Sequence, residues 1–291
     1  MPSDAVPSPP PSPRLSAIAG FRLVTADLPR LSRFYRDVLG FVADGPERPI
    51  DGAAMRLLGL HGTGRRQALR LGQQTVSIDQ YDPPGRPYPA DADAASLAFQ
   101  HLALVVADMA RAYRRVQAAT AISVGGPQHL PASSGGVHAY KFRDPDGHPL
   151  ELLQFPDDAP AWPGGSAGPD TVAHGIDHSA ISVADAGASI AFYRACGLTP
   201  GVPTLNAGPA QQCLDGLRDV EVAVVPLLPA QPAPHLELLA YHRPRGTAVA
   251  PWRADDVAAT RIVWQGGRAE LLRDPDGHLH EVTGPSRTPL L

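Results

Sequence analysis

The chain has 291 residues, of which 43% are hydrophobic and 19% are charged, and its formal net charge is −4. This composition predicts a globular protein with room for two domains. The weak negative charge argues against a nucleic-acid or anionic-membrane surface, and no apolar run approaches the roughly 20 residues that span a bilayer. Only two cysteines, Cys196 and Cys213, are present, which argues against a disulfide framework and favours a reducing, cytoplasmic location.

The chain opens on a proline-rich stretch, MPSDAVPSPPPSP, without the basic start and apolar centre of a signal peptide. We expect residues 1–16 to be a disordered tail. Proline- and glycine-rich segments farther along predict a first domain over residues 17–157, a linker over 158–172 and a second domain over 173–285.

A strand-then-helix pattern occurs three times. FRLVTADLPRLSRFYRDVLGF at 21–41 is matched by HLALVVADMARAYRRV at 101–116 and by SAISVADAGASIAFYRACGL at 179–198. In each copy, alternating apolar residues predict a half-buried strand. The aspartate that follows, Asp27, Asp108 or Asp185, is a typical N-cap and predicts the start of a helix.

A second pattern closes these modules. FRDPDGHPLELLQF at 142–155 matches LLRDPDGHLHEVTG at 271–284, and its Asp-Pro-Asp-Gly predicts a turn between two strands. His148 and His278 belong to that turn and are expected to be structural, whereas His242 and His280 are expected at the surface. A different ending is shared by 75–87 and 235–246.

These patterns divide the chain into four modules, at about 18–83, 99–156, 175–243 and 257–283. The first three predict a strand, a helix and about three strands. In the fourth, the span from Asp256 to Asp274 is half the equivalent span from Asp108 to Asp144. A helix does not fit there, so the fourth module is expected to consist of strands alone.

The strand–Asp–helix start together with the Asp-Pro-Asp-Gly-His-x-x-Glu end resembles the vicinal oxygen chelate superfamily, which includes glyoxalase I, extradiol dioxygenases and bleomycin-binding proteins. The resemblance implies an α+β fold in which tandem βαβββ modules pair into curved mixed-sheet half-barrels, here with a truncated fourth module. It also implies a divalent metal, bound by the first and last strands of the modules.

Carrying these ligand positions over places Gly20, His101 and His178 in the first-strand slots, with the fourth slot near Ala259. The last-strand slots hold Ser77, Glu151, Glu237 and Glu281. The resemblance therefore implies a metal bound by residues from His101, Glu151, His178, Glu237 and Glu281. Such a mixed nitrogen and oxygen set suits Fe(II), Mn(II), Ni(II) or Zn(II). Glu237 would also serve as a general base, and Tyr241 as an acid or hydrogen-bond donor unless it only packs in the core.

Two pairings of the modules remain open. If neighbours in sequence pair, one cleft holds His101 and Glu151, and the other holds His178, Glu237 and Glu281. If the second module pairs with the third, one cleft gathers His101, Glu151, His178 and Glu237. We favour the second pairing because it unites both complete ligand sets.

The resulting functional hypothesis is a metal-dependent enzyme for a small substrate with adjacent oxygens, either a ring-cleaving dioxygenase or a glyoxalase-like lyase or isomerase. The alternative is a non-catalytic small-molecule-binding protein of the antibiotic-resistance type, and a degenerate structural member is a third. We expect a small molecule as the partner, no nucleic acid and no membrane, and we allow for a homodimer.

Overall fold

The computed structural model describes residues 14–163, 171–231 and 234–284. The expected tail therefore lies outside the described residues up to residue 13, and the expected linker does so over 164–170. Leu15 is buried, and its N–H donates to the carbonyl of Cys196 at 2.8 Å. Leu15, which was expected in the tail, thus packs against the fold.

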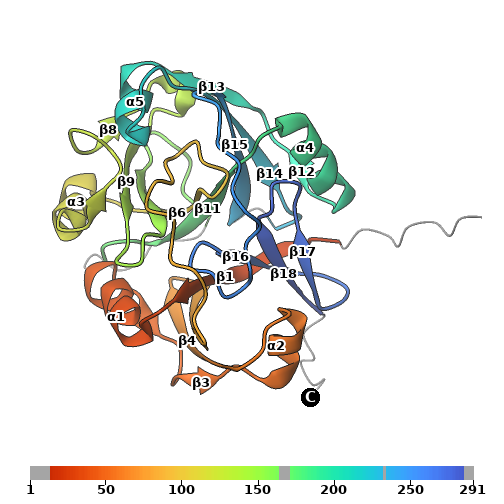
Figure 1. Cartoon of the computed structure of the whole chain (residues 1–291). Helices are drawn as coiled ribbons and strands as arrows, with labels where there is room; N and C mark the ends of the chain where they lie inside the picture. The colour runs from red at the N-terminus through yellow and green to blue at the C-terminus, as the bar shows by residue number, and fades with distance from the viewer. Residues whose placement is uncertain (1–13, 164–170, 232–233, 285–291) are drawn as a thin grey trace, which may run out of the picture.

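The elements follow the predicted modules (Figure 1). The first contains β1 (Ala17–Thr25), α1 (Leu28–Arg33), the π-helical turn η1 (Phe34–Val38), β2 (Val42–Ala43), β3 (Arg48–Pro49), α2 (Gly52–Leu57), β4 (Thr63–Leu71) and β5 (Gln74–Asp82). The second contains β6 (Gln100–Val105), α3 (Met109–Val116), β7 (Thr120–Ala121), β8 (Gln128–His129), η2 (Ala132–Ser134), β9 (His138–Arg143) and β10 (Pro149–Gln154).

The third contains β11 (Gly175–Ser182), α4 (Ala186–Ala195), β12 (Thr199–Pro200), β13 (Thr204–Ala207), α5 (Pro209–Asp215), β14 (Glu221–Leu228) and β15 (His235–Arg243). The fourth contains β16 (Arg261–Gln265), β17 (Glu270–Arg273) and β18 (Leu279–Thr283). Its described residues form no helix, which confirms the prediction made from its length. None of the described helices is long and apolar enough to cross a membrane.

The three predicted N-caps are present. The carboxylates of Asp27, Asp108 and Asp185 each accept a backbone N–H three residues later, at 3.0, 2.8 and 3.0 Å. Each cap satisfies a donor that a helix start would otherwise leave unpaired, so α1, α3 and α4 begin at fixed points directly after their strands.

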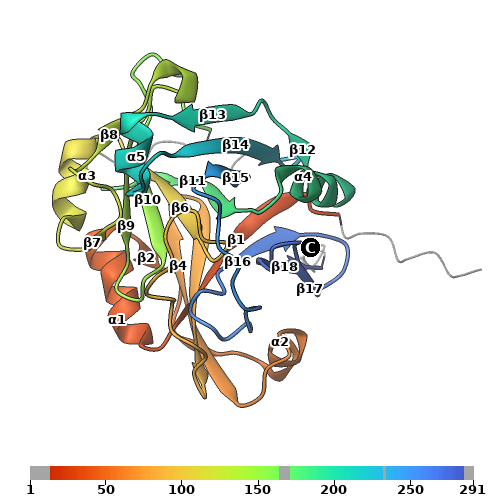
Figure 2. The same cartoon turned by 45° about the horizontal axis from the view of Figure 1, so that its top comes forward.

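Two sheets result: one joins the second module with the third, the pairing favoured from the sequence, and the other joins the first with the fourth. The 1–4 sheet has the order β17-β18-β16-β1-β5-β4-β2, with β3 also on β4. The 2–3 sheet has the order β12-β14-β15-β11-β6-β10-β9-β7, with β13 on β14 and β8 on β9. Figures 1 and 2 show the 2–3 sheet above the 1–4 sheet. Both ranges expected as domains, 17–157 and 173–285, therefore contribute strands to both sheets.

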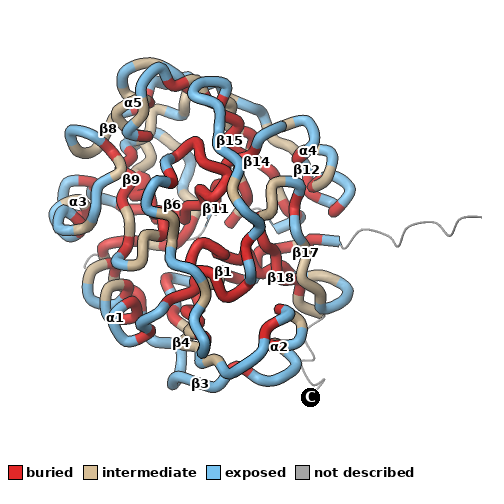
Figure 3. The backbone as a smooth tube through the Cα atoms, viewed as in Figure 1, coloured by how far each residue is buried: buried red, intermediate tan, exposed pale blue. Residues whose placement is uncertain are grey.

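Within each sheet the modules meet through antiparallel first strands, β1 with β16 and β6 with β11. The first and last strands inside a module run parallel, so both sheets are mixed, as expected. The largest apolar core contains residues of both sheets and of α1, α3 and α4. Figure 3 shows this burial along the central strands β1, β6 and β11. The core covers one side of each sheet. The candidate site lies on the opposite side of the 2–3 sheet.

Candidate metal centre

Strand register brings the two complete ligand sets together. Across the 2–3 sheet, Glu151 on β10 stands beside Ala103 on β6, which stands beside His178 on β11. In the adjacent row, His101 stands beside Ala180, which stands beside Glu237 on β15. Alternate residues of a strand share a face, so all four candidate ligands lie on one side of the sheet. The two alanines leave room between them.

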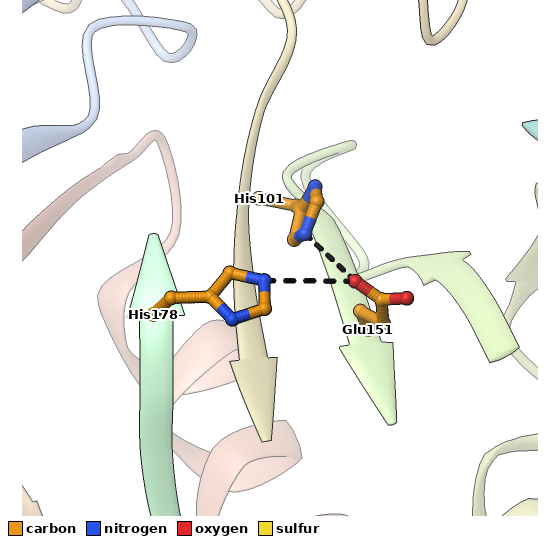
Figure 4. Close-up of side chains that lie close together, drawn as sticks. All are labelled: His101, Glu151 and His178. Carbon is orange, nitrogen blue, oxygen red and sulfur yellow. Dashed lines mark ion pairs between the residues drawn. The ribbon is translucent and has the colours of Figure 1, made fainter. Parts of the chain in front are cut away.

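The distances agree with donors that share one ion. His101 Nε2 lies 2.8 Å from Glu151 Oε2, and His178 Nε2 lies 3.9 Å from the same oxygen (Figure 4). Glu237 Oε2 is 3.5 Å from His178 Nε2. Metal bonds of about 2.0–2.2 Å separate two donors by about 2.8–4.3 Å, depending on the angle between them. His101, Glu151 and His178 form a compact group of potential ligands, and Glu237 borders it beside His178.

His101 provides a test of whether these residues fit a metal. Its side chain is 2% exposed, and neither ring nitrogen has a hydrogen-bond partner of acceptable geometry among the described residues. The short approach to Glu151 therefore lacks the direction of a hydrogen bond. A buried imidazole without hydrogen-bond partners is costly. A bound cation would remove part of this cost, because a ring nitrogen would then donate its lone pair to the metal. The orphaned nitrogen fits a metal.

His178 has the support that metal-bound histidines usually receive. Its Nδ1 lies 2.9 Å from Asp177 Oδ2, which leaves Nε2 facing Glu151 and Glu237. Trp162 Nε1 donates to the other oxygen of Asp177 at 2.7 Å. A carboxylate on the second nitrogen fixes the tautomer and the ring orientation. A second group of potential ligands, Asp177, His178 and His235, shares His178 with the first.

The electrostatics of the cluster favour a cation. Burial by itself would raise the pKa of Glu151, but the positive charges of Lys141 and His178 help to outweigh it, and that pKa is held at about 2. Glu237 likewise has a pKa of about 2, because His178 and His235 outweigh its burial. Burial lowers the pKa of His101, which keeps its ring neutral. Two ionised carboxylates thus face a neutral imidazole, an arrangement that a divalent ion would balance.

Without an ion, His178 supplies the balancing charge. Burial would lower its pKa, but Glu237, Asp177 and Glu151 together raise it to about 9. A metal would replace the proton of this ring, because a ligating imidazole must be neutral.

A cavity of about 240 Å³ opens above the cluster. His101, Glu151, His178 and Glu237 line it on one side, and its walls are mainly apolar. The apolar lining includes Leu130, Val137, Leu153, Phe155, Val224 and Leu239. A small ligand would be enclosed by these walls, with its polar end against the ionisable side chains.

The comparisons with known proteins bear on the family and the fold. Residues 16–152 match the family model described as the Glyoxalase/Bleomycin resistance protein/Dioxygenase superfamily. The matched residues span the first and second modules. Glyoxalase I from Zea mays superposes with a TM-score of 0.55 at 15% identity, covering 94% of this chain and 92% of that chain. A protein described as a dioxygenase from Bacillus subtilis subsp. subtilis str. 168 gives a TM-score of 0.55 at 12% identity, with 94% and 86% covered. These identities establish the fold alone, and no curated protein matches the sequence.

Two predicted site residues lie elsewhere. Glu281 is on the 1–4 sheet, where Arg22 binds it through two nitrogens at 2.6 and 2.8 Å, so it is not beside the histidines. Tyr241 lines the cavity, but its hydroxyl donates to Asp215 at 3.0 Å. Burial, with Asp215 adding to it, raises the pKa of Tyr241 well above its usual value.

The slot expected near Ala259 falls instead at Arg261. Arg22 pairs with Arg261 across β1 and β16, just as Ala103 pairs with His178 across β6 and β11. The sequence count failed because the fourth module has no capped helix from which to count back. Arg261 is fully buried and binds Asp79 at 2.7 Å, so a guanidinium stands where the other sheet has a histidine.

Sequence reasoning also missed Asp177, His235, Lys141, Asp215 and Gln211. Asp177 could have been noticed because it directly precedes His178. Lys141 pairs with Glu151 across the β9–β10 hairpin, so counting the hairpin register from the Asp-Pro-Asp-Gly turn could have found Lys141. Lys141 is also the only lysine of the chain. Asp215 and Gln211 come from α5, for which the sequence offered no motif.

Proposed function

We propose that this protein is a metal-dependent enzyme that moves a proton on a small substrate with two adjacent oxygens, as a glyoxalase-like isomerase or lyase. One observation carries the proposal. Matching slots of two modules bring two imidazoles and two carboxylates together in the lining of one cavity. The superfamily and the fold agree with it.

His101, Glu151 and His178 would hold the metal, with Glu237 as a fourth ligand or as a carboxylate beside it. The mixed donor set suits Zn(II), Ni(II), Mn(II) or Fe(II). When bound, a divalent ion would draw charge from two adjacent substrate oxygens as a Lewis acid.

The side chains of the chain supply the remaining chemistry. Glu237 is ionised and borders the cluster, so it is placed to accept a proton from a substrate carbon next to the chelating oxygens. Asp177 holds the His178 ring in place, and the apolar walls limit the entry of water. Tyr241 acts through Asp215 as a positioning residue, because its hydroxyl proton is already donated.

The test begins with the metal content of the full chain, then with the Zn(II)-, Ni(II)-, Mn(II)- and Fe(II)-loaded protein. The substrates are hemithioacetals of 2-oxoaldehydes with small thiols, followed by NMR in D2O. We expect metal-dependent turnover that falls at least about 100-fold in Glu237→Gln while the metal is retained. Glu221→Gln, a carboxylate paired with Arg243 at the surface, is the matched control. Metal-independent turnover, or full activity of Glu237→Gln, would contradict the assignment.

A specific observation also favours a second candidate. His101, Glu151 and His178 form a group of three potential ligands that does not include Glu237. A set of two histidines and one carboxylate is typical of non-haem Fe(II) oxygenases. Oxygen uptake with catechols by the Fe(II)-loaded protein would identify a dioxygenase. If no metal binds and apolar ligands do, the protein is a non-catalytic binding protein.

A further inference from the structure

Lys141 stands out in both sequence and structure. The chain has 25 basic Lys and Arg residues, and Lys141 is the only lysine among them. It is 3% exposed and lines the cavity, with its Nζ 2.7 Å from Asp215 Oδ1. Every other basic position is met by arginine, so the compact ammonium is used only here, against the cavity.

Gln211 shares the same carboxylate. Its Nε2 donates to Asp215 Oδ2 at 2.7 Å, which fixes the orientation of the amide, because the reverse orientation would set two acceptors against each other. Its Oε1 is then buried without a hydrogen-bond partner among the described residues, and Gln211 lines the cavity. An unpaired buried acceptor is costly unless a ligand or water supplies a donor.

Tyr241, which also lines the cavity, completes this group. Its hydroxyl donates to the same Asp215 oxygen as Gln211 does. Asp215 therefore contacts three side chains. Two of them, Lys141 and Gln211, offer a donor and an acceptor to a ligand in the cavity. Gly216 ends α5 just after Asp215 at φ +64°, where an added Cβ would lie 2.5 Å from the Ile122 carbonyl oxygen. The close approach holds Asp215 in position.

We propose that Lys141 and Gln211, held by Asp215, form a subsite that binds a hydroxyl group of the substrate, in addition to the two oxygens that face the metal cluster. A hydroxyl can accept from the ammonium and donate to Gln211 Oε1 at once. A carboxylate cannot, since it has no proton for that oxygen. The charge of Lys141 is also already opposed by Asp215 and Glu151. The substrate class is thus a small, largely apolar, uncharged molecule with adjacent oxygens and one further hydroxyl.

This inference rests on the proposed function for the adjacent oxygens, but the subsite can be tested without a metal. The probes are phenol, anisole and benzoate, titrated into the metal-free full chain by ligand-observed NMR. Phenol both donates and accepts, anisole only accepts, and benzoate is an anion that only accepts. We expect phenol to bind about tenfold more tightly than anisole, the effect of one buried acceptor left unpaired.

The key variant is Gln211→Met, which keeps the length of the side chain and removes the acceptor. It is expected to abolish the preference for phenol. Gln212→Met is the matched control, because Gln212 is the next residue of α5 and accepts instead from the Asp219 N–H. Lys141→Met serves only as a folding comparison, since it would leave Asp215 buried without its cation. Equal binding of phenol and anisole, a preference that survives in Gln211→Met, or tighter binding of benzoate would overturn the subsite.

A second arm links the subsite to the metal cluster. The Co(II)-loaded full chain is titrated with benzohydroxamate, which carries two adjacent oxygens, and with its 3-hydroxy and 4-hydroxy derivatives. At least one derivative is expected to bind about tenfold more tightly, and Gln211→Met should remove that gain. If neither derivative gains, the subsite does not serve the substrate of the cluster. If the protein binds no metal, the proposed function fails while the phenol result stands.

Discussion

Asp177 shows that the candidate site depends on side chains beyond the four that the repeats identify. It sits beside His178 on β11 and accepts from that ring and from Trp162. The matching slots could be counted because both modules keep the same offset from a helix cap. The side chains that support the candidate ligands could not be identified in this way, because their contacts arise from packing between distant segments.

Replacement of Asp177 tests its role. In Asp177→Asn the side chain keeps its size but loses its charge, so His178 is less well oriented and is a weaker donor. We expect the affinity for Zn(II), measured by competition with a chromophoric chelator, to fall about 10–100-fold. Asp158→Asn, an exposed change in the same half of the chain, should leave the affinity unchanged. Equal affinities for both variants would show that Asp177 does not support a ligand.

His280 corrects an expectation at the same scale. It was predicted at the surface, but it is fully buried between Trp264 and Tyr193. Trp264 Nε1 donates to its Nδ1 at 3.0 Å, and Tyr193 gives its own proton to Asp274. The ring must therefore be neutral, with its proton on Nε2. The sequence could not show this, because the partners come from β16 and α4.

This environment predicts a pH effect on stability. Burial, reinforced by His278 and opposed by Asp274, lowers the pKa of His280 to about 4. The unfolded chain protonates this ring below about pH 6.5, while the folded chain resists protonation down to about pH 4. The stability that the neutral His280 ring contributes is thus fully present above pH 6.5. It is lost as the pH falls, and the free energy of unfolding drops by about 3 kcal/mol in all.

Urea unfolding of wild type and His280→Gln at pH 7.5 and pH 4.5 measures this contribution. The variant should lose less stability between the two pH values than the wild type does. His242→Gln, at an exposed histidine, is the control and should follow the wild type. An equal loss in wild type and His280→Gln would contradict the neutral, buried ring.

At the scale of elements, the two half-barrels share one architecture and differ in what occupies the centre. Where the 2–3 sheet has Ala103 and Ala180 between the candidate ligands, the 1–4 sheet has Arg22 and Val263. Arg22 and Arg66 make two-nitrogen contacts with Glu281 and Asp79, and Arg261 binds Asp79, Tyr81 and the Ala254 carbonyl. The larger side chains fill the space that the alanines leave open.

This network should stabilise the fold without affecting the metal. Arg261→Met leaves Asp79 buried with one fewer cation, and we expect the free energy of unfolding to fall by about 3–5 kcal/mol. The Zn(II) affinity of the folded variant should be unchanged. Arg268→Met, which removes an exposed ion pair with Glu270, should change stability by less than about 1 kcal/mol. A loss of metal affinity in Arg261→Met would place a metal site in the 1–4 sheet.

At the scale of the whole molecule, the modules are joined in two ways. The sheets link the second module with the third and the first with the fourth. The repeated tyrosines link the other neighbours, because Tyr35 donates to Asp144 at 3.1 Å and Tyr193 donates to Asp274 at 2.9 Å. The sequence revealed both repeated motifs, and the family resemblance predicted the fold. That the tyrosine of one module binds the turn of the next emerges only in three dimensions.

The two tyrosine contacts should differ in strength. Asp144 Oδ2 also meets His148 Nδ1 at 2.8 Å, whereas Tyr193 supports both Asp274 and His280. We expect Tyr193→Phe to lower the free energy of unfolding by about 2–3 kcal/mol and Tyr35→Phe by about 1 kcal/mol. Chemical denaturation of both variants checks the order. A larger loss in Tyr35→Phe would show that the hydrogen-bond chain through His280 adds little.

The central claim is that the second and third modules build one metal centre. Anomalous diffraction at the zinc edge, from crystals of the full chain grown with Zn(II), tests it most directly. We predict a strong peak within about 2.3 Å of His101 Nε2, His178 Nε2 and a Glu151 carboxylate oxygen. Absence of a peak there, or a peak only between Asp177 and His235 or among the arginines of the 1–4 sheet, would contradict the account.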